Sequence, residues 1–277
     1  MTDKNDWQGR VGASWADEYE RTDRSFSVLT DRLLGLASSG GFSRALDIGC
    51  GAGELSLALG RGHPSAVIRG IDISERLIEA ARRRGSRRGN VGFEIADAAR
   101  WKPVTLDAAP DLLVSRHGVM FFEDPAGAFS HLRSIAAPSA RFVFSCFRNR
   151  DENNWATEVS SLLPGSPAAS PDGPGPFALA NREKTAGLLE QAGWEDVRLE
   201  PFDFPYIAGG GDNPVEDAVS YFLSIGPAAR AAADLTPEAR AGFTDDLRHL
   251  LGKHRDGGLV MLKAAAWLVS ATAPERP

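Results

Sequence analysis

Leu46-Asp47-Ile48-Gly49-Cys50-Gly51-Ala52-Gly53 is the stretch of sequence that decides the fold. It begins as a short apolar strand, then has glycine at every other position, and a helical pattern follows from Glu54. Glycines at a strand-to-helix turn let the backbone adopt positive φ and approach a ligand closely. The amide groups at the start of the following helix then face that ligand. We therefore predict a strand–loop–helix unit that binds a small molecule with its backbone.

The spacing of these glycines limits which ligand the loop accepts. They stand at 49, 51 and 53, which differs from the G-x-G-x-x-G fingerprint of dinucleotide-binding domains. Glu54 would oppose a pyrophosphate at the helix start, because like charges repel in a low-dielectric crevice. Asp47 adds a negative charge just before the loop. The pattern favours a cationic or zwitterionic ligand, although the loop alone could also be a buried turn without a ligand.

The segments around the loop predict an α/β fold. Short apolar runs alternate with helical patterns at the spacing of βαβ units, which favours a parallel sheet with helices on both faces. One or two amphipathic helices are expected within 5–40, ahead of the first strand, and a loop at 164–176. We expect strands at 45–48, 67–72, 91–96, 111–115, 141–147, 196–204 and 259–271, and helices at 54–59, 74–84, 125–136, 181–192 and, in two or three pieces, 214–251.

Two acidic residues follow the next two strands. Asp72 ends the second predicted strand, where a carboxylate can accept hydrogen bonds from both hydroxyls of a ribose. Asp97 stands just past the third strand, where it can accept from an adenine amine, and Ala98 offers a backbone N–H beside it. An aspartate at a strand end can also simply cap the next helix.

Four stretches together resemble the successive motifs of class I S-adenosylmethionine-dependent methyltransferases. They are Ala45 to Gly53, Gly70 to Ser74, Phe93 to Ala98 and Asp111 to Phe122. The sequence is similar to bacterial enzymes of the ubiquinone/menaquinone-biosynthesis-like subgroup, from about Trp7 to Ser270. The resemblance implies a Rossmann-like class I methyltransferase fold, with a seven-stranded, mostly parallel sheet in the order 3-2-1-4-5-7-6 and an antiparallel seventh strand.

The same resemblance implies S-adenosyl-L-methionine as the cofactor and S-adenosyl-L-homocysteine as its product. Asp72 would then bind the ribose, Ile73 and Ala98 would flank the adenine, and Asp97 would accept from its amine. The methionine part would be held by the loop, whose residues in the predicted site are Asp47, Gly49, Cys50, Gly51 and Gly53.

The end of the fourth predicted strand should face the methyl group, because open α/β sheets bind ligands at the carboxyl ends of their strands. This places Ser115, Arg116 and His117 in the site. His117 could take a proton from a substrate hydroxyl or ammonium, or it could be a packed histidine without chemistry. Arg116 could pair with a carboxylate of the substrate or of the cofactor, which we favour, or with a structural aspartate.

Aromatic residues complete the predicted site. Trp15 lies in the N-terminal segment that by resemblance folds over the cofactor, and its ring could attract a sulfonium or could belong to the core. Aromatic residues in segments expected to roof the site favour an apolar or aromatic substrate. They are Trp155, Phe177, Tyr206 and Phe222.

These observations predict a methyltransferase that acts in line on an oxygen, nitrogen or carbon nucleophile of a small molecule. A protein that binds S-adenosylmethionine without catalysis is one alternative. A nicotinamide-dependent oxidoreductase is another, which the glycine spacing disfavours. The expected organisation is an N-terminal helical cap at 1–40, a cofactor-binding core at 41–205 with a loop at 150–178 near the substrate, a helical lid inserted at 206–256, and the final strand and tail at 257–277.

Composition excludes several classes of function. The formal net charge is −6 over 277 residues, so no global field attracts nucleic acid, and the arginines between 82 and 88 are expected at a solvated helix end. The two cysteines, Cys50 and Cys146, predict neither a disulfide framework nor a metal site. No signal peptide or membrane-spanning run is visible, so we expect a cytoplasmic monomer or homodimer without a membrane partner.

Overall fold

The strands of the computed structural model, which describes residues 4–163 and 173–275, form one mixed sheet. Its order is β3-β2-β1-β4-β5-β8-β6, with the short β7 paired to β8. The strands are β1 Arg44–Ile48, β2 Val67–Asp72, β3 Val91–Ile95, β4 Leu112–Arg116, β5 Arg141–Phe147, β6 Glu195–Gly210, β7 Arg255–Asp256 and β8 Leu259–Thr272.

The sheet topology agrees with the predicted methyltransferase order. β1 to β5 pair in parallel, and β8 runs antiparallel to both β5 and β6. β1 and β4 lie side by side although β2 and β3 separate them in the sequence, so the strand order reverses beside β1. An open α/β sheet leaves a crevice at such a switch point, and the predicted glycine loop follows β1 directly.

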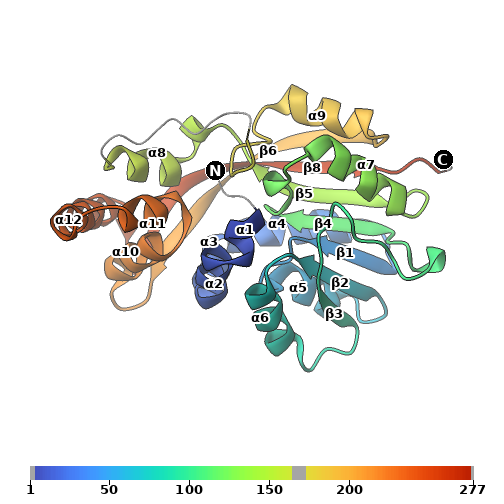
Figure 1. The fold of residues 1–277 in the computed structure, drawn as a ribbon, viewed down its shortest axis with the longest axis horizontal. Coiled ribbons are helices and arrows are strands. Elements are labelled where there is room, and N and C mark those ends of the chain that lie inside the picture. The colour runs from blue at the N-terminus through green and yellow to red at the C-terminus, as the bar shows by residue number, and fades with distance from the viewer. Residues whose placement is uncertain (1–3, 164–172, 276–277) are drawn as a thin grey trace.

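Helices cover both faces of the sheet (Figure 1). α7 packs with α9 on one face, and α4 packs with α5 on the other. The helices are α1 Lys4–Gln8, α2 Arg10–Asp17, α3 Tyr19–Ser25, α4 Ser27–Ser38, α5 Glu54–Gly62, α6 Glu75–Gly85, α7 Pro125–Ile135, α8 Asn154–Ser161, α9 Arg182–Gln191, α10 Pro214–Ser224, α11 Gly226–Ala233 and α12 Pro237–Lys253, with short 3-10 turns at Leu106–Ala108, Val119–Phe121 and Arg150–Glu152.

The N-terminal segment forms four short helices, where one or two were expected. The helical geometry is interrupted at Gly9, Glu18 and Phe26, so the segment is divided into separate helices, with α1 packed on α2. α2 packs on the start of α6 so closely that a Cβ on Gly12 would lie 2.3 Å from the Ser74 hydroxyl oxygen. Figure 1 shows these helices between the sheet and the block made by α10, α11 and α12.

The last two strands of the core, β6 and β8, are much longer than the others and extend to that helical block (Figure 1). Sequence analysis predicted β6 only as far as Phe204, because its last residues, Ile207 to Gly210, include no polar–apolar alternation. The segment 150–178, predicted as a loop, contains α8 in its described part, and 164–172 lies outside the described residues. The two-residue β7 was too short to predict.

Candidate functional site

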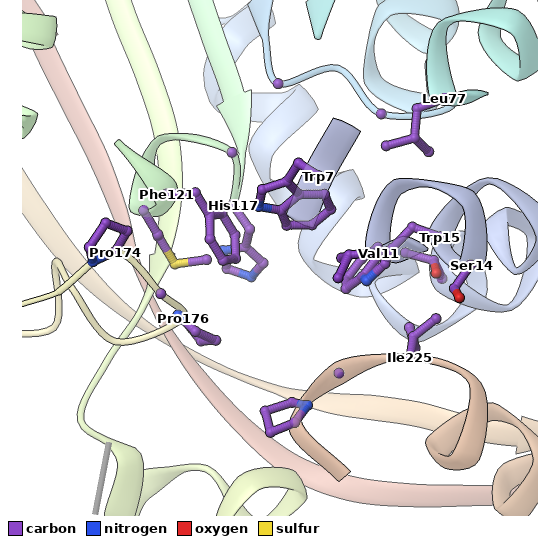
Figure 2. Close-up of a pocket in the computed structure, with 18 of the residues that line it drawn as sticks. Trp7, Val11, Ser14, Trp15, Leu77, His117, Phe121, Pro174, Pro176 and Ile225 are labelled. Carbon is purple, nitrogen blue, oxygen red and sulfur yellow. The ribbon is translucent and has the colours of Figure 1, made fainter. Parts of the chain in front are cut away.

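A cavity of about 1370 Å³ opens at the carboxyl ends of β1, β2 and β4. Figure 2 shows its lining from separate parts of the chain: Trp7, Val11 and Trp15 of the N-terminal helices, Leu77 of α6, His117 after β4 and Ile225 between α10 and α11. Pockets for single small molecules have volumes of roughly 300–1,000 Å³. The cavity therefore has room for two ligands side by side.

The loop after β1 presents its backbone to this cavity. Gly49 and Gly51 have φ of 63° and 54°, which a residue with a side chain rarely adopts. A Cβ on Gly51 would meet no atom within 4 Å, and a Cβ on Gly49 would lie 3.0 Å from Cα of Gly118. The loop can thus come within van der Waals distance of a ligand on one side and of the end of β4 on the other.

Gly53 and Cys50, two residues of the predicted loop site, are placed differently with respect to the cavity. Gly53, with φ of 87°, does not line the cavity, and a Cβ there would lie 2.7 Å from the Phe93 ring. Its absence of a side chain lets α5 approach β3, so the structure gives it a packing role, and its contact with the cofactor stays a prediction. Cys50 lines the cavity, but burial raises the pKa of its thiol well above the usual range and keeps it protonated and unreactive.

Asp72 connects the second strand to the glycine loop. One carboxylate oxygen accepts from the backbone N–H of Gly51 at 3.0 Å, and the other from that of Ser74 at 2.9 Å. Each oxygen has a second lone pair, so the carboxylate can still accept from ligand hydroxyls. Asp72 and the next residue, Ile73, both line the cavity.

Asp97 and Ala98 lie at the neighbouring strand end and also line the cavity. Asp97 binds the Lys4 ammonium at 2.7 Å and accepts from the N–H of Ala99 at 3.0 Å. These contacts outweigh its partial burial and lower the pKa of the carboxyl. The ion pair places α1 directly over this end of the cavity.

Asp47 is the most buried charge of the site, with 1% of its surface exposed. Burial raises the pKa of its carboxyl to about 6, although the Ser56 hydroxyl donates to it at 2.6 Å. A carboxylate held in this way gains most from a cationic ligand group, because a nearby positive charge stabilises its ionised form.

The predicted residues at the end of β4 diverge in role. Ser115 is fully buried and does not line the cavity; its hydroxyl donates to the Ile48 carbonyl at 2.7 Å and accepts from the N–H of Gly118 at 3.1 Å. Its predicted contact with the methyl group is therefore wrong. Arg116 lines the cavity but pairs with Asp23 at 3.1 Å and donates to Thr30 at 2.9 Å. Arg116 thus pairs with a structural aspartate, whereas sequence analysis favoured a carboxylate of the substrate or of the cofactor.

Asp23 also binds a second arginine, Arg84, at 2.8 Å. Arg84 pairs in addition with Glu54 at 2.6 Å and lies over the Tyr19 ring. Sequence analysis expected the whole basic run at a solvated helix end. Arg87 and Arg88 are indeed exposed, but Arg84 is not, because it is paired inside the site. Because its charge is paired, Glu54 repels an anion less than its position in the sequence suggested.

His117 is held in an unusual backbone conformation, with φ of 63°, and only 8% of it is exposed. Its ring stacks on Phe147 with centroids 4.1 Å apart, and Nδ1 lies 3.4 Å from the Ser145 hydroxyl. Among the described residues Nε2 has no hydrogen-bond partner. Burial, together with the nearby Arg116 charge, lowers the pKa of the imidazole to about 3, so the ring is neutral.

Aromatic rings line the cavity around His117, and we call this set the aromatic end. Its rings contact one another in a closed circuit, with centroids 4.1 to 5.8 Å apart. The circuit consists of Phe26, His117, Phe147, Trp155 and Tyr206, and Phe177 stacks on Trp155 from outside it. The predicted Trp155, Phe177, Tyr206 and Phe222 all line the cavity.

Trp15 lines the cavity and also packs against the core formed by Ala16, Ala52, Leu77 and Ala80. Its ring lies 5.6 Å from that of Trp7, which in turn contacts Phe121 at 5.0 Å. Figure 2 shows Trp7 between His117 and Trp15. The two interpretations offered for Trp15, a cofactor contact and a core residue, are thus compatible.

Residues 19–199 match the protein family described as "Methyltransferase domain". The chain belongs to this family. The family does not single out the ubiquinone/menaquinone-biosynthesis-like subgroup, which stays a prediction. Membership favours methyl transfer over the nicotinamide-dependent chemistry considered from the sequence.

Curated relatives of this methyltransferase domain include two trans-aconitate 2-methyltransferases. The protein from Methylobacterium radiotolerans is 34% identical over 94 residues, which are 34% of each chain. The protein from Streptomyces coelicolor is 29% identical over 229 residues, covering 75% of this chain and 68% of the relative. The chain thus spans about a third of the length of the first relative and about two thirds of the second.

A solved structure of phosphoethanolamine N-methyltransferase 2 from Haemonchus contortus, in complex with S-adenosyl-L-methionine, has the same fold. The TM-score is 0.58 at 14% identity, with 99% of this chain and 60% of the other covered. The likeness extends the methyltransferase fold to nearly the whole chain.

Sequence analysis missed several residues of this methyltransferase site. Asp23 had no motif to mark it, and Gly118 was not selected although it lies within the motif at 111–122, next to a predicted site residue. Trp7, Phe147 and Tyr221 line the cavity from segments far apart in the sequence. In the described part of the chain, no group of three or more His, Cys, Asp or Glu side chains is placed to hold a metal ion, and no helix is both long and apolar enough to cross a membrane.

Proposed function

We propose that this chain transfers a methyl group from S-adenosylmethionine to a small molecule bound at the aromatic end of the cavity. The observation that carries the proposal is the hydrogen bond from the Gly51 N–H to Asp72. It joins the glycine loop to the acidic end of β2 and presents both to a cavity with room for two ligands.

The residues present fit S-adenosylmethionine. Gly51 leaves open space where a side chain would stand, so the amino acid part can lie against the loop. Asp47 would bind its ammonium group and Asp72 its ribose hydroxyls, while Ile73, Asp97 and Ala98 would surround its adenine. Trp15 would face the sulfonium, and the indole N–H of Trp7, which is buried without a partner among the described residues, would donate to a ligand acceptor.

Bound S-adenosylmethionine supplies an activated methyl group, so the protein mainly has to align the acceptor and exclude water. Alignment of two bound reactants can contribute roughly 7–11 kcal/mol in favourable cases. The aromatic end restricts the acceptor to one region beside the loop, since β4 ends between the two. His117 contributes as a neutral hydrogen-bonding group; with a pKa of about 3 it is too weakly basic to remove a proton efficiently before the methyl arrives.

The lining of the aromatic end favours an apolar or aromatic acceptor with an oxygen, nitrogen or carbon nucleophile. The negative net charge favours a small molecule over a nucleic acid as the acceptor. The segments 1–40 and 206–256 serve as cap and lid over the core formed by 41–205 and 257–277. Ion pairs of Arg21 with Asp217 at 2.8 Å and of Arg24 with Asp217 at 2.7 Å support this, because they join the cap to the lid.

Isothermal titration with S-adenosylmethionine, S-adenosylhomocysteine and NADH tests the proposal. Both adenosyl ligands should bind, and Asp72→Ala should weaken them roughly 10- to 100-fold by removing a charged acceptor. Asp246→Ala is the matched control, because Asp246 is exposed on α12, and it should bind like the wild type. A preference for NADH, or adenosyl binding that Asp72→Ala leaves unchanged, would contradict the proposal.

A further inference from the structure

We propose that the aromatic end binds an uncharged aromatic molecule that carries a hydroxyl group, and that Nε2 of His117 is the hydrogen-bond partner of this hydroxyl. The inference rests on the proposed function and narrows its substrate class. It follows from three features of the described residues: a polar atom without a partner, a lining of rings, and the pairing of the adjacent cation.

The polar atom without a partner is Nε2 of His117. The imidazole is fixed on its other side, because Nδ1 lies 3.4 Å from the Ser145 hydroxyl and the ring stacks on Phe147. The positive φ of His117 is a strained conformation for a residue with a side chain, and such strain is concentrated at functional sites. A hydroxyl can both donate and accept, so it pairs with Nε2 in either tautomer of the neutral ring.

The rings around His117 determine which kind of molecule can carry the hydroxyl group. The circuit from Phe26 through Tyr206 presents ring faces and edges, which pack well against another ring. The hydroxyl of Tyr206 in the circuit is already engaged: it donates to Tyr221 at 3.3 Å, and Tyr221 donates to Thr22 at 3.2 Å. A flat ring with a single polar group therefore matches this lining.

Charge argues against a carboxylate here. Arg116 precedes His117 in the sequence, but its guanidinium pairs with Asp23 and Thr30. A carboxylate among the rings would lose its hydration without gaining the charge of Arg116, which costs far more than burying a hydroxyl. The cation to test is Arg150, a half-buried cavity residue outside the ring circuit.

The position of His117 places the hydroxyl between the two ends of the cavity. The next residue, Gly118, approaches Gly49 so closely that a Cβ on Gly49 would lie 3.0 Å from its Cα. His117 is thus joined directly to the residue that contacts the glycine loop. A hydroxyl on Nε2 would lie at the boundary between the loop and the aromatic end.

Binding of model arenes tests the inference. We would titrate 1-naphthol, naphthalene, 1-naphthoate and trans-aconitate into the protein, with and without saturating S-adenosylhomocysteine. 1-Naphthol should bind about tenfold more tightly than naphthalene, as one hydrogen bond allows, and 1-naphthoate at least tenfold more weakly than 1-naphthol. His117→Phe, which keeps a ring against Phe147, should abolish the preference for 1-naphthol and leave naphthalene binding unchanged.

A second variant guards against a folding defect, because phenylalanine is unfavourable at positive φ. His117→Asn tolerates that conformation and should also lose the preference for 1-naphthol. Arg150→Met should leave the order of the probes unchanged. Tighter binding of 1-naphthoate or trans-aconitate, or a preference for 1-naphthol that survives both His117 variants, would overturn the inference. If S-adenosylhomocysteine does not bind at all, the proposed function fails, and the titrations without it still decide the arene preference.

Discussion

The two ends of the cavity are lined by different kinds of groups. At the cofactor end, backbone amides and strand-end carboxylates form the lining, and Asp72 and Asp97 are both paired with groups of the protein. At the aromatic end, side chains from β5, α8, β6, the residue after β4 and the residue before α4 form the lining, and Nε2 of His117 has no partner among the described residues. Backbone geometry is fixed by the fold, whereas side chains can change without altering it. The first end can therefore keep one ligand while the second changes substrate.

The two ends of the cavity adjoin each other at the end of β4. Gly118 contacts the glycine loop, and the preceding His117 belongs to the ring circuit. Substitutions on either side of this boundary should affect one end more than the other if the comparison holds.

Gly118→Ala should have the largest effect and should act on the cofactor end. The new Cβ would lie 2.7 Å from the Ile48 carbonyl oxygen and 3.1 Å from Cα of Gly49, and backbone on both sides cannot easily move. We expect a loss of about 3 kcal/mol in the free energy of unfolding and at least about 100-fold weaker S-adenosylmethionine binding, measured by denaturation and titration. Gly35→Ala in α4 meets no atom within 4 Å and should stabilise slightly. Unchanged cofactor affinity in Gly118→Ala would show that the loop does not depend on β4.

Asp47→Asn should stabilise the protein against unfolding and should weaken the binding of the cofactor. The folded pKa of about 6 lies above the unfolded value, so the wild type loses stability as pH rises from the unfolded pKa through 6. The variant avoids this loss, so its free energy of unfolding should exceed that of the wild type by about 2 kcal/mol at pH 8. At pH 5 this difference between variant and wild type should be smaller by roughly 1 kcal/mol. Denaturation at both pH values measures it, with Asp246→Asn as an exposed control. A difference that grows in acid would refute the raised pKa.

The cofactor end was also the part that the sequence predicted best. Its residues follow strands directly, so the pattern at 45–53 and the acids at 72 and 97 were sufficient to place them along the cavity, and their contacts with the cofactor stay a prediction. The sheet order was confirmed, because the same motifs fix the order of β1 to β5. The packing role of Gly53 could not be foreseen, because a glycine needed for packing against Phe93 has the same sequence pattern as one that contacts a ligand.

The aromatic end could be predicted only in part. Trp155, Phe177, Tyr206 and Phe222 were expected to roof the site, but contacts such as those of Tyr206 with Phe26 and of Trp155 with Phe147 depend on tertiary packing. The partner of Arg116 could not be foreseen either, because Asp23 lies 93 residues away. Long-range side-chain pairs of this kind leave no periodic signal in one sequence.

Asp23→Asn tests how strongly the cap is tied to the cofactor end. The carboxylate bridges Arg84 at 2.8 Å and Arg116 at 3.1 Å, with 15 to 21% of these side chains exposed. Because water partly screens the pairs, we expect a loss of only about 1.5 kcal/mol in stability and faster hydrogen exchange in α3. Asp17→Asn, at an exposed position of α2, is the control and should exchange like the wild type. Unchanged exchange in α3 would mean that apolar packing alone holds the cap.

Tyr221→Phe should have the smallest effect and should be confined to the aromatic end. The hydroxyl accepts from Tyr206 and donates to Thr22, so its loss leaves two buried groups each short of one partner. We expect a loss of about 1 kcal/mol in the free energy of unfolding, with S-adenosylmethionine affinity unchanged. Tyr19→Phe, whose exposed hydroxyl contacts Glu20, should change neither quantity. If Tyr221→Phe weakened the binding of S-adenosylmethionine as much as the binding of 1-naphthol, the two ends would be coupled through α3. The two ends would then differ in composition but not in how substitutions affect their binding energies.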